Sequence, residues 1–233
     1  MKEQSKLSLN QLISDLDKMF PNARCELDYN NLFELIIAVS LSSQTTDKRV
    51  NEVTKVLFSK YPTYNDLAKA NIYEVEEILK PLGMNKVKAK NIIELSKKLI
   101  IKNKMPETLE ELMELDGVGR KCANVILSEY YKIPSIAVDT HVLRTSNRLG
   151  LASGSVLEVE KKLMKKFDKK DWYFIHIHLV FLGRYVCKAK NKECAKCLIN
   201  GCPSRFIWIN VCDIYPNIFF IILTFSSSIK CKL

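Results

Sequence analysis

The stretch of sequence that decides the fold is Leu115-Asp116-Gly117-Val118-Gly119-Arg120-Lys121. Two glycines around one apolar residue let the backbone turn with its N–H groups facing outward, and the helix that follows adds the positive end of its dipole. We interpret this stretch as a helix–hairpin–helix that binds a DNA phosphate, with Val118 anchoring the turn to the core. An ordinary helix–helix turn is the alternative, because two glycines around one residue are a weak signal alone.

The chain on both sides of the hairpin has apolar residues at helical spacing and no convincing run of alternating residues. Glycine and proline are also scarce, with seven of each in 233 residues. These patterns predict an all-α protein. The expected helices cover residues 1–20, 31–41, 48–60, 64–80, 86–103, 108–115, 120–131, 141–149, 155–168 and 171–186.

The charge of the chain indicates a polyanionic partner. Lys and Arg number 36 against 26 Asp and Glu, which gives a net charge of +10. Nucleic acid and an anionic membrane surface are both compatible with this excess. The first 20 residues lack the apolar core of a signal peptide, so we expect an intracellular protein.

Residues 203–233 differ from the rest in having few charges and a nearly continuous apolar run over 218–225. That run is too short to span a bilayer, which takes about 20 residues. A packed terminal segment, a surface membrane contact and a sequence foreign to the fold all remain open, and we expect no membrane partner.

Two residues near the hairpin are candidates for catalysis. Lys121 would lie in the first turn of a helix, beside Arg120, where the dipole and the neighbouring charge both disfavour a protonated amine and so favour a nucleophile. Asp139 ends the apolar stretch 136–138, and a partly desolvated carboxylate there suits acid/base or electrostatic work. The plainer alternatives are a phosphate-contacting lysine and a helix cap.

Four cysteines lie within 16 residues and form the pattern C-x6-C-x2-C-x4-C: Cys187, Cys194, Cys197 and Cys202. Such clustering in a chain without an export signal indicates a metal site rather than disulfides. Structural zinc and a [4Fe–4S] cluster both accept four cysteine ligands, and the spacing alone does not decide between them.

Taken in order, these pieces resemble the endonuclease III family of base-excision-repair DNA glycosylases. The resemblance covers roughly residues 5–202, and its matching stretches are 36–47, 115–125, 136–144, 183–185 and the cysteine cluster. It implies a DNA cleft between two helical lobes: a six-helix lobe over 25–136, and an iron–sulfur lobe made of 1–24 plus 137–202. Residues 203–233 would form an atypical tail.

The resemblance also implies roles for individual residues. Lys121 matches the Schiff-base nucleophile and Asp139 the catalytic aspartate, while Gln44 matches the residue that fills the gap left by the extruded nucleotide. Met84 occupies the position of an apolar wedge. The expected DNA-binding residues are Gln44 and Met84, together with the hairpin residues and three lysines of the cysteine loop that could meet phosphates: Gly117, Val118, Gly119, Arg120, Lys188, Lys190 and Lys192. Capping for Gln44 and a core contact for Met84 are the alternatives.

The implied activity is that of a bifunctional DNA glycosylase and AP lyase, which acts as a monomer on double-stranded DNA containing an oxidised pyrimidine or an abasic site. One [4Fe–4S] cluster is the implied cofactor, held by the four cysteines. The sequence departs from the family pattern at three places. The last two cysteines are one residue closer than usual, Leu182 stands where a histidine is common, and the tail matches nothing in the family.

Two other functions remain open. A helix–hairpin–helix DNA-binding protein with a structural metal would need neither Lys121 nor Asp139. A catalytically impaired relative would keep both residues and lose activity through the altered loop or tail.

Overall fold

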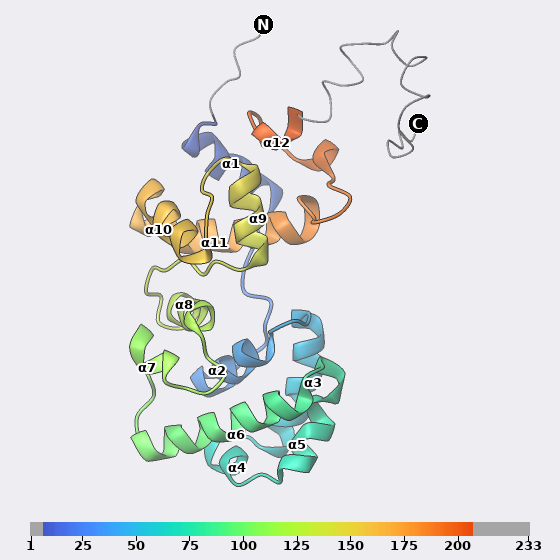
Figure 1. The fold of residues 1–233 in the computed structure, drawn as a ribbon, viewed down its shortest axis with the longest axis vertical. Helices are drawn as coiled ribbons and strands as arrows, with labels where there is room; N and C mark the ends of the chain where they lie inside the picture. The colour runs from blue at the N-terminus through green and yellow to red at the C-terminus, as the bar shows by residue number, and fades with distance from the viewer. Residues whose placement is uncertain (1–6, 207–233) are drawn as a thin grey trace, which may run out of the picture.

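The computed structural model describes residues 7–206, and every regular element within them is helical. The all-α prediction is therefore confirmed for this part of the chain (Figure 1). The apolar run 218–225 and most of the predicted tail lie outside the described residues.

The lower part of the molecule in Figure 1 is built around one helix that is buried on all sides. Each residue of α2 (Leu32–Leu41) is buried, and α3, α6 and α8 pack against it. A helix with no polar face must be surrounded in this way. The surrounding elements are α3 (Asp47–Lys60), α4 (Tyr64–Ala68), α5 (Ile72–Leu79), η1 (Lys80–Leu82), α6 (Asn85–Lys102), α7 (Leu109–Met113) and α8 (Arg120–Glu129).

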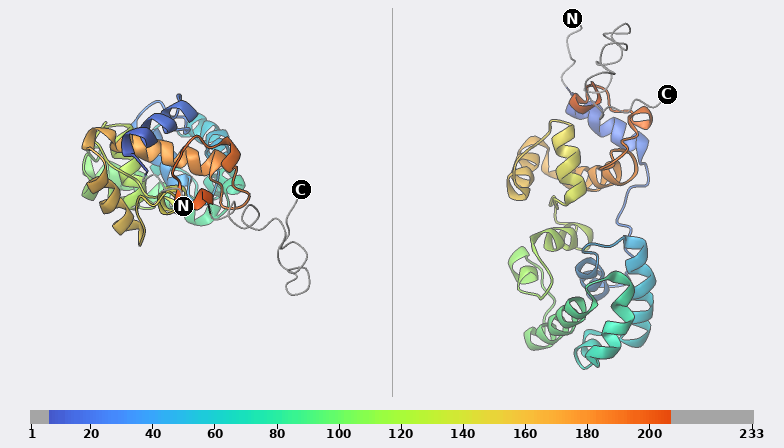
Figure 2. Two further views of the ribbon diagram at one scale, coloured as in Figure 1. Left: turned by 90° about the horizontal axis from the view of Figure 1, so that it is seen from above. Right: turned by 45° about the vertical axis from the view of Figure 1, so that its right-hand side comes forward.

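The upper part joins the N-terminal helix to the elements that follow residue 139 (Figures 1 and 2). In it α11 contacts α1 and α9, and α10 contacts α9. Its elements are α1 (Leu9–Met19), α9 (Thr140–Arg148), α10 (Val156–Lys166), η2 (Lys169–Asp171), α11 (Trp172–Phe181), η3 (Leu182–Val186), η4 (Cys194–Lys196) and α12 (Pro203–Phe206).

The buried apolar side chains form two separate clusters. The first cluster runs from Leu27 to Leu127 and belongs to the lower part. The second cluster combines Leu12 and Leu16 of α1 with residues from Ile136 to Ile199. Full burial of a leucine contributes roughly 1.5–3 kcal/mol, so each cluster has enough members to hold its own helices together. The division into lobes at residues 25 and 136 stays a prediction, and the two clusters support it.

Two expected helices differ in the structure. The helix expected over 64–80 is divided into α4 and α5, because the Asn71 side chain accepts a hydrogen bond from the Tyr73 N–H and starts a new helix. The helix expected over 171–186 widens after Phe181 into the π-helical turn η3. The widened turn contains Gly183, whose role in the site is described below.

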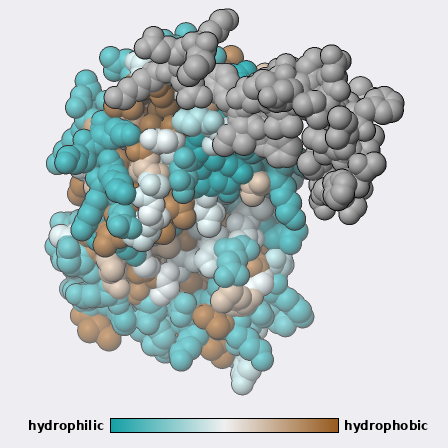
Figure 3. Space-filling view, turned by 45° about the horizontal axis from the view of Figure 1, so that its top comes forward, coloured by the Kyte–Doolittle hydropathy of each residue, from teal (hydrophilic) through white to brown (hydrophobic). Residues whose placement is uncertain are grey.

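The outer surface of the described residues is mainly hydrophilic on the face drawn in Figure 3, with apolar side chains in scattered patches. Within residues 7–206, no helix has the length and apolar character needed to cross a bilayer.

Candidate active site

The hairpin between α7 and α8 is anchored by its middle residue. Val118 is buried, and its N–H donates to the carbonyl of Leu115 at 3.1 Å. Gly117 has φ +77°, and a Cβ built on it would lie 2.8 Å from Ser40 Oγ. Only glycine satisfies both the left-handed backbone and the close approach to α2.

Gly119 serves a different purpose from Gly117. Its φ of −88° suits any residue, and a Cβ on it would meet no atom within 4 Å. Gly119 is also the N-cap of α8, and it has no side chain to satisfy the free N–H groups of that helix. The start of α8 is therefore open to an anion from outside.

Arg120, at the first position of α8, is paired within the protein. Its Nε and Nη2 both face the carboxylate of Glu160 on α10, with Nη2 and Oε1 2.6 Å apart. The Glu160 side chain is only 3% exposed, and its hydrogen bonds raise the pKa of Arg120. The pair ties the start of α8 to the upper part, while 44% of the arginine side chain stays exposed to solvent.

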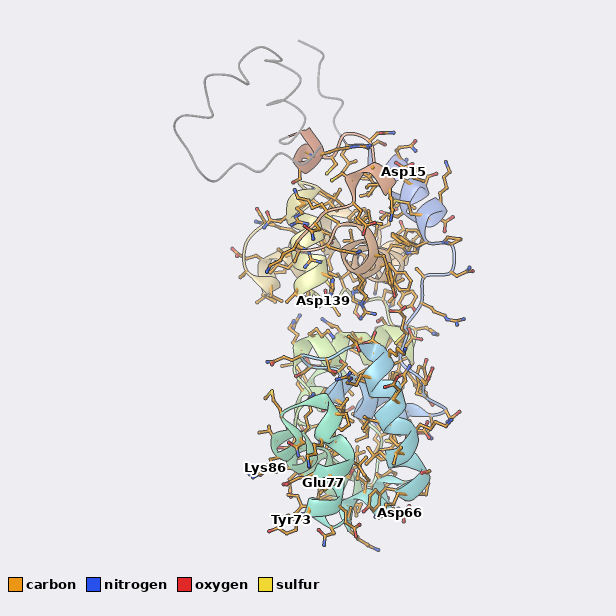
Figure 4. The ribbon with its side chains drawn as sticks, turned by 90° about the vertical axis from the view of Figure 1, so that its right-hand side faces the viewer. Asp15, Asp66, Tyr73, Glu77, Lys86 and Asp139 are labelled. Carbon is orange, nitrogen blue, oxygen red and sulfur yellow. The ribbon has the colours of Figure 1, made fainter. Side chains whose placement is uncertain are left out.

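Asp139 is the N-cap of α9. Its Oδ1 accepts hydrogen bonds from the N–H groups of His141 at 2.9 Å and Val142 at 2.8 Å. The apolar residues 136–138 before it are buried. Figure 4 shows Asp139 at the end of the upper part that faces the lower part. Asp139 is therefore a helix cap, as the alternative predicted. The cap uses only Oδ1, so Oδ2 can still serve in catalysis.

Lys121 and Asp139 both act on a third residue that the sequence analysis missed. His176 on α11 is 4% exposed, and its Nδ1 is buried without a hydrogen-bond partner. Burial lowers the pKa of His176 to about 4; the charge of Asp139 raises it and that of Lys121 lowers it. That Lys121 and Asp139 form one catalytic site stays a prediction, and their shared influence on this buried imidazole supports it.

Gln44 and Met84 project from two loops of the lower part, and both have left-handed backbones. Gln44 has φ 59° and Met84 has φ 51°. Met84 is 52% exposed, so it is not a core contact. Gln44 is also exposed, and the N-cap of α3 is Thr46 rather than Gln44. Neither alternative from the sequence therefore accounts for these two residues.

A cavity of about 760 Å³ opens between the start of α3 and the start of α9, where it is lined by Asp47, His141 and Arg184 among others. Burial opposes the charge of Arg184, but Asp47 and Glu26 raise its pKa overall. Gly183 makes this packing possible, since a Cβ on it would lie 2.8 Å from the Cβ of His141. The residues that line this cavity include charged side chains of both signs.

The four cysteines of the cluster line one small cavity with apolar walls, which include Leu149, Leu182 and Val186. Arg148 holds the loop against α9, because its guanidinium donates to the carbonyl of Lys188 at 2.7 Å and to Cys187 Sγ at 3.3 Å. Burial raises the pKa of the Cys197 and Cys202 thiols. The cysteine cavity shares no lining residue with the larger cavity at Asp47 and Arg184.

The three lysines expected to bind DNA have different surroundings. Lys188 pairs with Glu193, whose pKa Lys188 and Lys196 together lower to about 2. Lys192 is half-buried and lines the cysteine cavity. Lys190 is exposed. Their DNA-binding role stays a prediction.

The hairpin, the all-helical fold and the open start of α8 together define a class of protein, the helix–hairpin–helix DNA repair proteins. A family model described as HhH-GPD superfamily base excision DNA repair protein matches residues 37–169. Endonuclease III of Bacillus subtilis (strain 168) is 49% identical over 198 residues, which span 82% of this chain and 90% of that protein.

Two solved structures are also similar. They are described as a trapped endonuclease III–DNA covalent intermediate (estranged-adenine complex) and a non-covalent endonuclease III–DNA complex. Each has a TM-score of 0.81 and 44% identity, and each match covers 88% of this chain and 97% of the other. The chain belongs to the endonuclease III family, the bifunctional DNA glycosylases and AP lyases of base excision repair.

Proposed function

We propose that this enzyme removes oxidised pyrimidines from duplex DNA and then cuts the strand at the resulting abasic site. Lys121 is the nucleophile and Asp139 its partner. The observation that carries the proposal is that the pair of Arg120 with Glu160 ties the start of α8, which carries Lys121, to the upper part, where Asp139 caps α9. A protein that only binds DNA has no need of an amine and a carboxylate at one position.

In the first step the neutral amine of Lys121 attacks C1′ of the damaged nucleotide. The bond from C1′ to the base breaks, and its electron pair leaves with the base, which takes up a proton. The amine passes a proton to the free carboxylate oxygen of Asp139, and the C1′–O4′ bond then opens as O4′ takes up that proton, which leaves a protonated imine between Nζ and C1′. Before this transfer the Asp139 carboxylate stabilises the positive charge that develops on the sugar.

In the second step the imine acidifies the hydrogen on C2′. Removal of that proton forms a C2′=C3′ double bond and expels the 3′ phosphate, so the strand breaks 3′ to the lesion by β-elimination. Water then hydrolyses the imine and frees Lys121. No organic cofactor takes part in this sequence.

We propose that DNA is held by phosphate contacts and by insertion into the duplex. The open N–H groups of Gly119 and the next residues suit a phosphate. Val118 supports the turn from the core, while Gln44 and Met84 fill the stack once the damaged nucleotide has left it. Gly117, Arg120, Lys188, Lys190 and Lys192 complete the proposed surface. The enzyme acts as an intracellular monomer.

We propose that Cys187, Cys194, Cys197 and Cys202 hold one [4Fe–4S] cluster. Their shared cavity and its apolar walls support this fit. Within residues 7–206, no three His, Cys, Asp or Glu side chains are placed so that they could hold a single metal ion together. Four thiolates on one zinc ion would lie about 3.8 Å apart, since each Zn–S bond is about 2.3 Å in a tetrahedron. A cube with four irons keeps its thiolates farther apart. When bound, the cluster fastens the loop and takes no part in the reaction.

A trapping experiment tests the nucleophile. Borohydride added to the enzyme with a thymine-glycol duplex should reduce the imine and leave a stable protein–DNA adduct. Lys121→Gln should abolish the adduct and leave DNA binding largely intact, because the hairpin N–H groups remain. Lys161→Gln, which removes an exposed lysine of α10, should trap as well as the original enzyme.

The carboxylate is tested by the rate of base release. Asp139→Asn should bind the same duplex but release the base about a hundredfold more slowly, a common magnitude for acid/base and charge stabilisation. Undiminished trapping in Lys121→Gln would assign the nucleophile to another residue. An unchanged rate in Asp139→Asn would leave that residue as a helix cap alone.

A further inference from the structure

Lys88 on α6 is a buried lysine without an acidic partner. It is 6% exposed, and no carboxylate pairs with it in the described part of the chain. Its Nζ donates to two backbone carbonyls, that of Ser43 at 3.0 Å and that of Leu82 at 3.1 Å. Burial lowers the pKa of Lys88. A buried charge is costly, and here it is offset by charge-assisted bonds to those carbonyls.

The two carbonyls belong to the two loops that carry Gln44 and Met84. Ser43 directly precedes Gln44, and Leu82 is separated from Met84 only by Gly83. Both exposed residues have left-handed backbones, a conformation that residues other than glycine keep only where the surroundings hold it. The ammonium group of Lys88 therefore holds both loops, each of which contains a residue with a left-handed backbone.

Three other hydrogen bonds at the turns of these loops are long. The Thr45 N–H meets the Ser42 carbonyl at 3.5 Å, and the Gly83 N–H meets the Lys80 carbonyl at 3.3 Å. Arg49 reaches the carbonyl of Pro81 at 3.5 Å from an exposed position. The two short bonds of Lys88 are the strongest of these polar contacts, because they are charge-assisted and shielded from water.

We propose that Lys88 is a positioning residue that couples Gln44 to Met84, so that the two side chains enter the DNA stack as one unit. The inference rests on the proposed function, since it assumes that both side chains enter the duplex. Lys88 does not touch DNA in this role; it acts through the two loops that its ammonium joins.

The test compares Lys88→Met with Lys86→Met. Methionine keeps the unbranched length of lysine and removes its donors. Lys86 lies on the same helix but is exposed at the outside of the lower part (Figure 4), so its variant loses the same charge without the two bonds. Duplex entry is followed by the fluorescence of 2-aminopurine placed opposite the lesion, and base release by single-turnover kinetics.

Lys88→Met should lose most of the 2-aminopurine signal and release the base about ten- to a hundredfold more slowly, a typical consequence of misplaced groups. Its cleavage of an abasic site in single-stranded DNA should stay close to that of Lys86→Met, since no partner strand has to be entered. Equal signals and equal rates in the two variants would overturn the proposal.

A second measurement keeps the proposal testable if Lys88→Met does not fold. Gln44→Ala and Met84→Ala alter exposed side chains. In the wild-type enzyme their effects on base release should be non-additive, because the ammonium group of Lys88 holds both loops. Additive effects would overturn the coupling. An original enzyme that neither traps nor cleaves would instead refute the proposed function, which separates the two failures.

Discussion

The hairpin region, residues 109–129, and the cysteine loop, residues 187–202, each carry a proposed site, but they are stabilised in opposite ways. The hairpin region buries six apolar side chains: Leu112, Leu115, Val118, Ala123, Ile126 and Leu127. In the cysteine loop, Ile199 alone reaches that degree of burial, and the only regular element is the short turn η4.

The difference shows which site depends on a bound group. Apolar contacts hold the hairpin in shape whether or not DNA is present. The cysteine loop is held by three cysteines that pack against the second cluster and by polar contacts, those of Arg148 and of the ion pairs around Glu193. Partly exposed ion pairs contribute little, so we expect the loop to depend on a metal group that joins its thiolates.

The strongest test of this comparison removes one thiolate. Cys197→Ser should lose the broad visible absorbance of the cluster, and the amides of 187–202 should lose their protection from hydrogen exchange. The hairpin amides should keep theirs. Cys122→Ser makes the same chemical change in the hairpin region, where Cys122 is a half-buried residue outside the loop, and should retain the absorbance. A protected loop in Cys197→Ser would show that it holds itself together.

The short spacing before Cys202 has its own test. All four cysteines line the same cavity, so Cys202→Ser should lose the absorbance as Cys197→Ser does. Retention of the absorbance would remove Cys202 from the ligand set.

A smaller effect distinguishes the two hairpin glycines. Gly117→Ala should lower the free energy of unfolding by about 1–3 kcal/mol, because its φ is positive and its Cβ would collide with Ser40 Oγ. Gly119→Ala should cost less than about 1 kcal/mol, since its φ is ordinary and its surroundings are open.

Gly119→Ala should also differ from Gly117→Ala in its effect on DNA affinity. Gly119→Ala should weaken affinity for an undamaged duplex although it barely alters stability, because its methyl group stands where a phosphate approaches. Denaturant unfolding and a binding titration measure the two properties. An affinity unaffected by Gly119→Ala would argue against a phosphate at this turn.

A further modest effect concerns the stability of the protein in acid. Burial holds the pKa of His176 at about 4 in the folded protein, below the ordinary value of 6.5. Between these values the unfolded chain binds the proton and the folded chain does not, so stability falls as pH decreases from 6.5 towards 4. From pH 7 to pH 5.5 the loss should be about 1 kcal/mol. His176→Asn should reduce this loss of stability. A pH dependence of unfolding equal to that of the wild-type protein would show that His176 is not its cause.

The same acid test compares the two clusters. Burial also lowers the pKa of His178, and both histidines lie on α11 in the upper part. Hydrogen exchange at pH 5.5 should therefore increase first in the second cluster, while amides of α2 stay protected.

Much of the fold was predictable because its signals are local. Apolar periodicity located most helices, and the two glycines located the hairpin. The division at Asn71 was missed because an asparagine inside a helical pattern shows its capping role only when the N–H of Tyr73, two residues on, turns towards it. The widening into η3 was missed because the local sequence carries no signal for it; in the structure it brings Gly183 against His141, which is far away in the sequence.

The candidate site was predictable to the extent that motifs carry it. Lys121, Asp139 and the cysteines stand in recognisable patterns. His176 and Lys88 do not, since nothing in the sequence separates His176 from His178, or Lys88 from Lys86 and Lys90, until the fold buries them. The pairing of Arg120 with Glu160 joins residues 40 positions apart, and nothing in the local sequence indicates it.

The residues of the second cluster are synthesised at widely separated times. Leu12 and Leu16 of α1 are fully buried, but their partners in the cluster begin at Ile136. A ribosome adds roughly 5–20 residues per second, so α1 emerges on the order of 10 seconds before the surface that covers it. The first cluster, by contrast, is contiguous in the chain and complete once Leu127 has emerged. At this stage of translation the first cluster can already be folded, while the apolar face of α1 is still uncovered. We expect chaperones to contact that face.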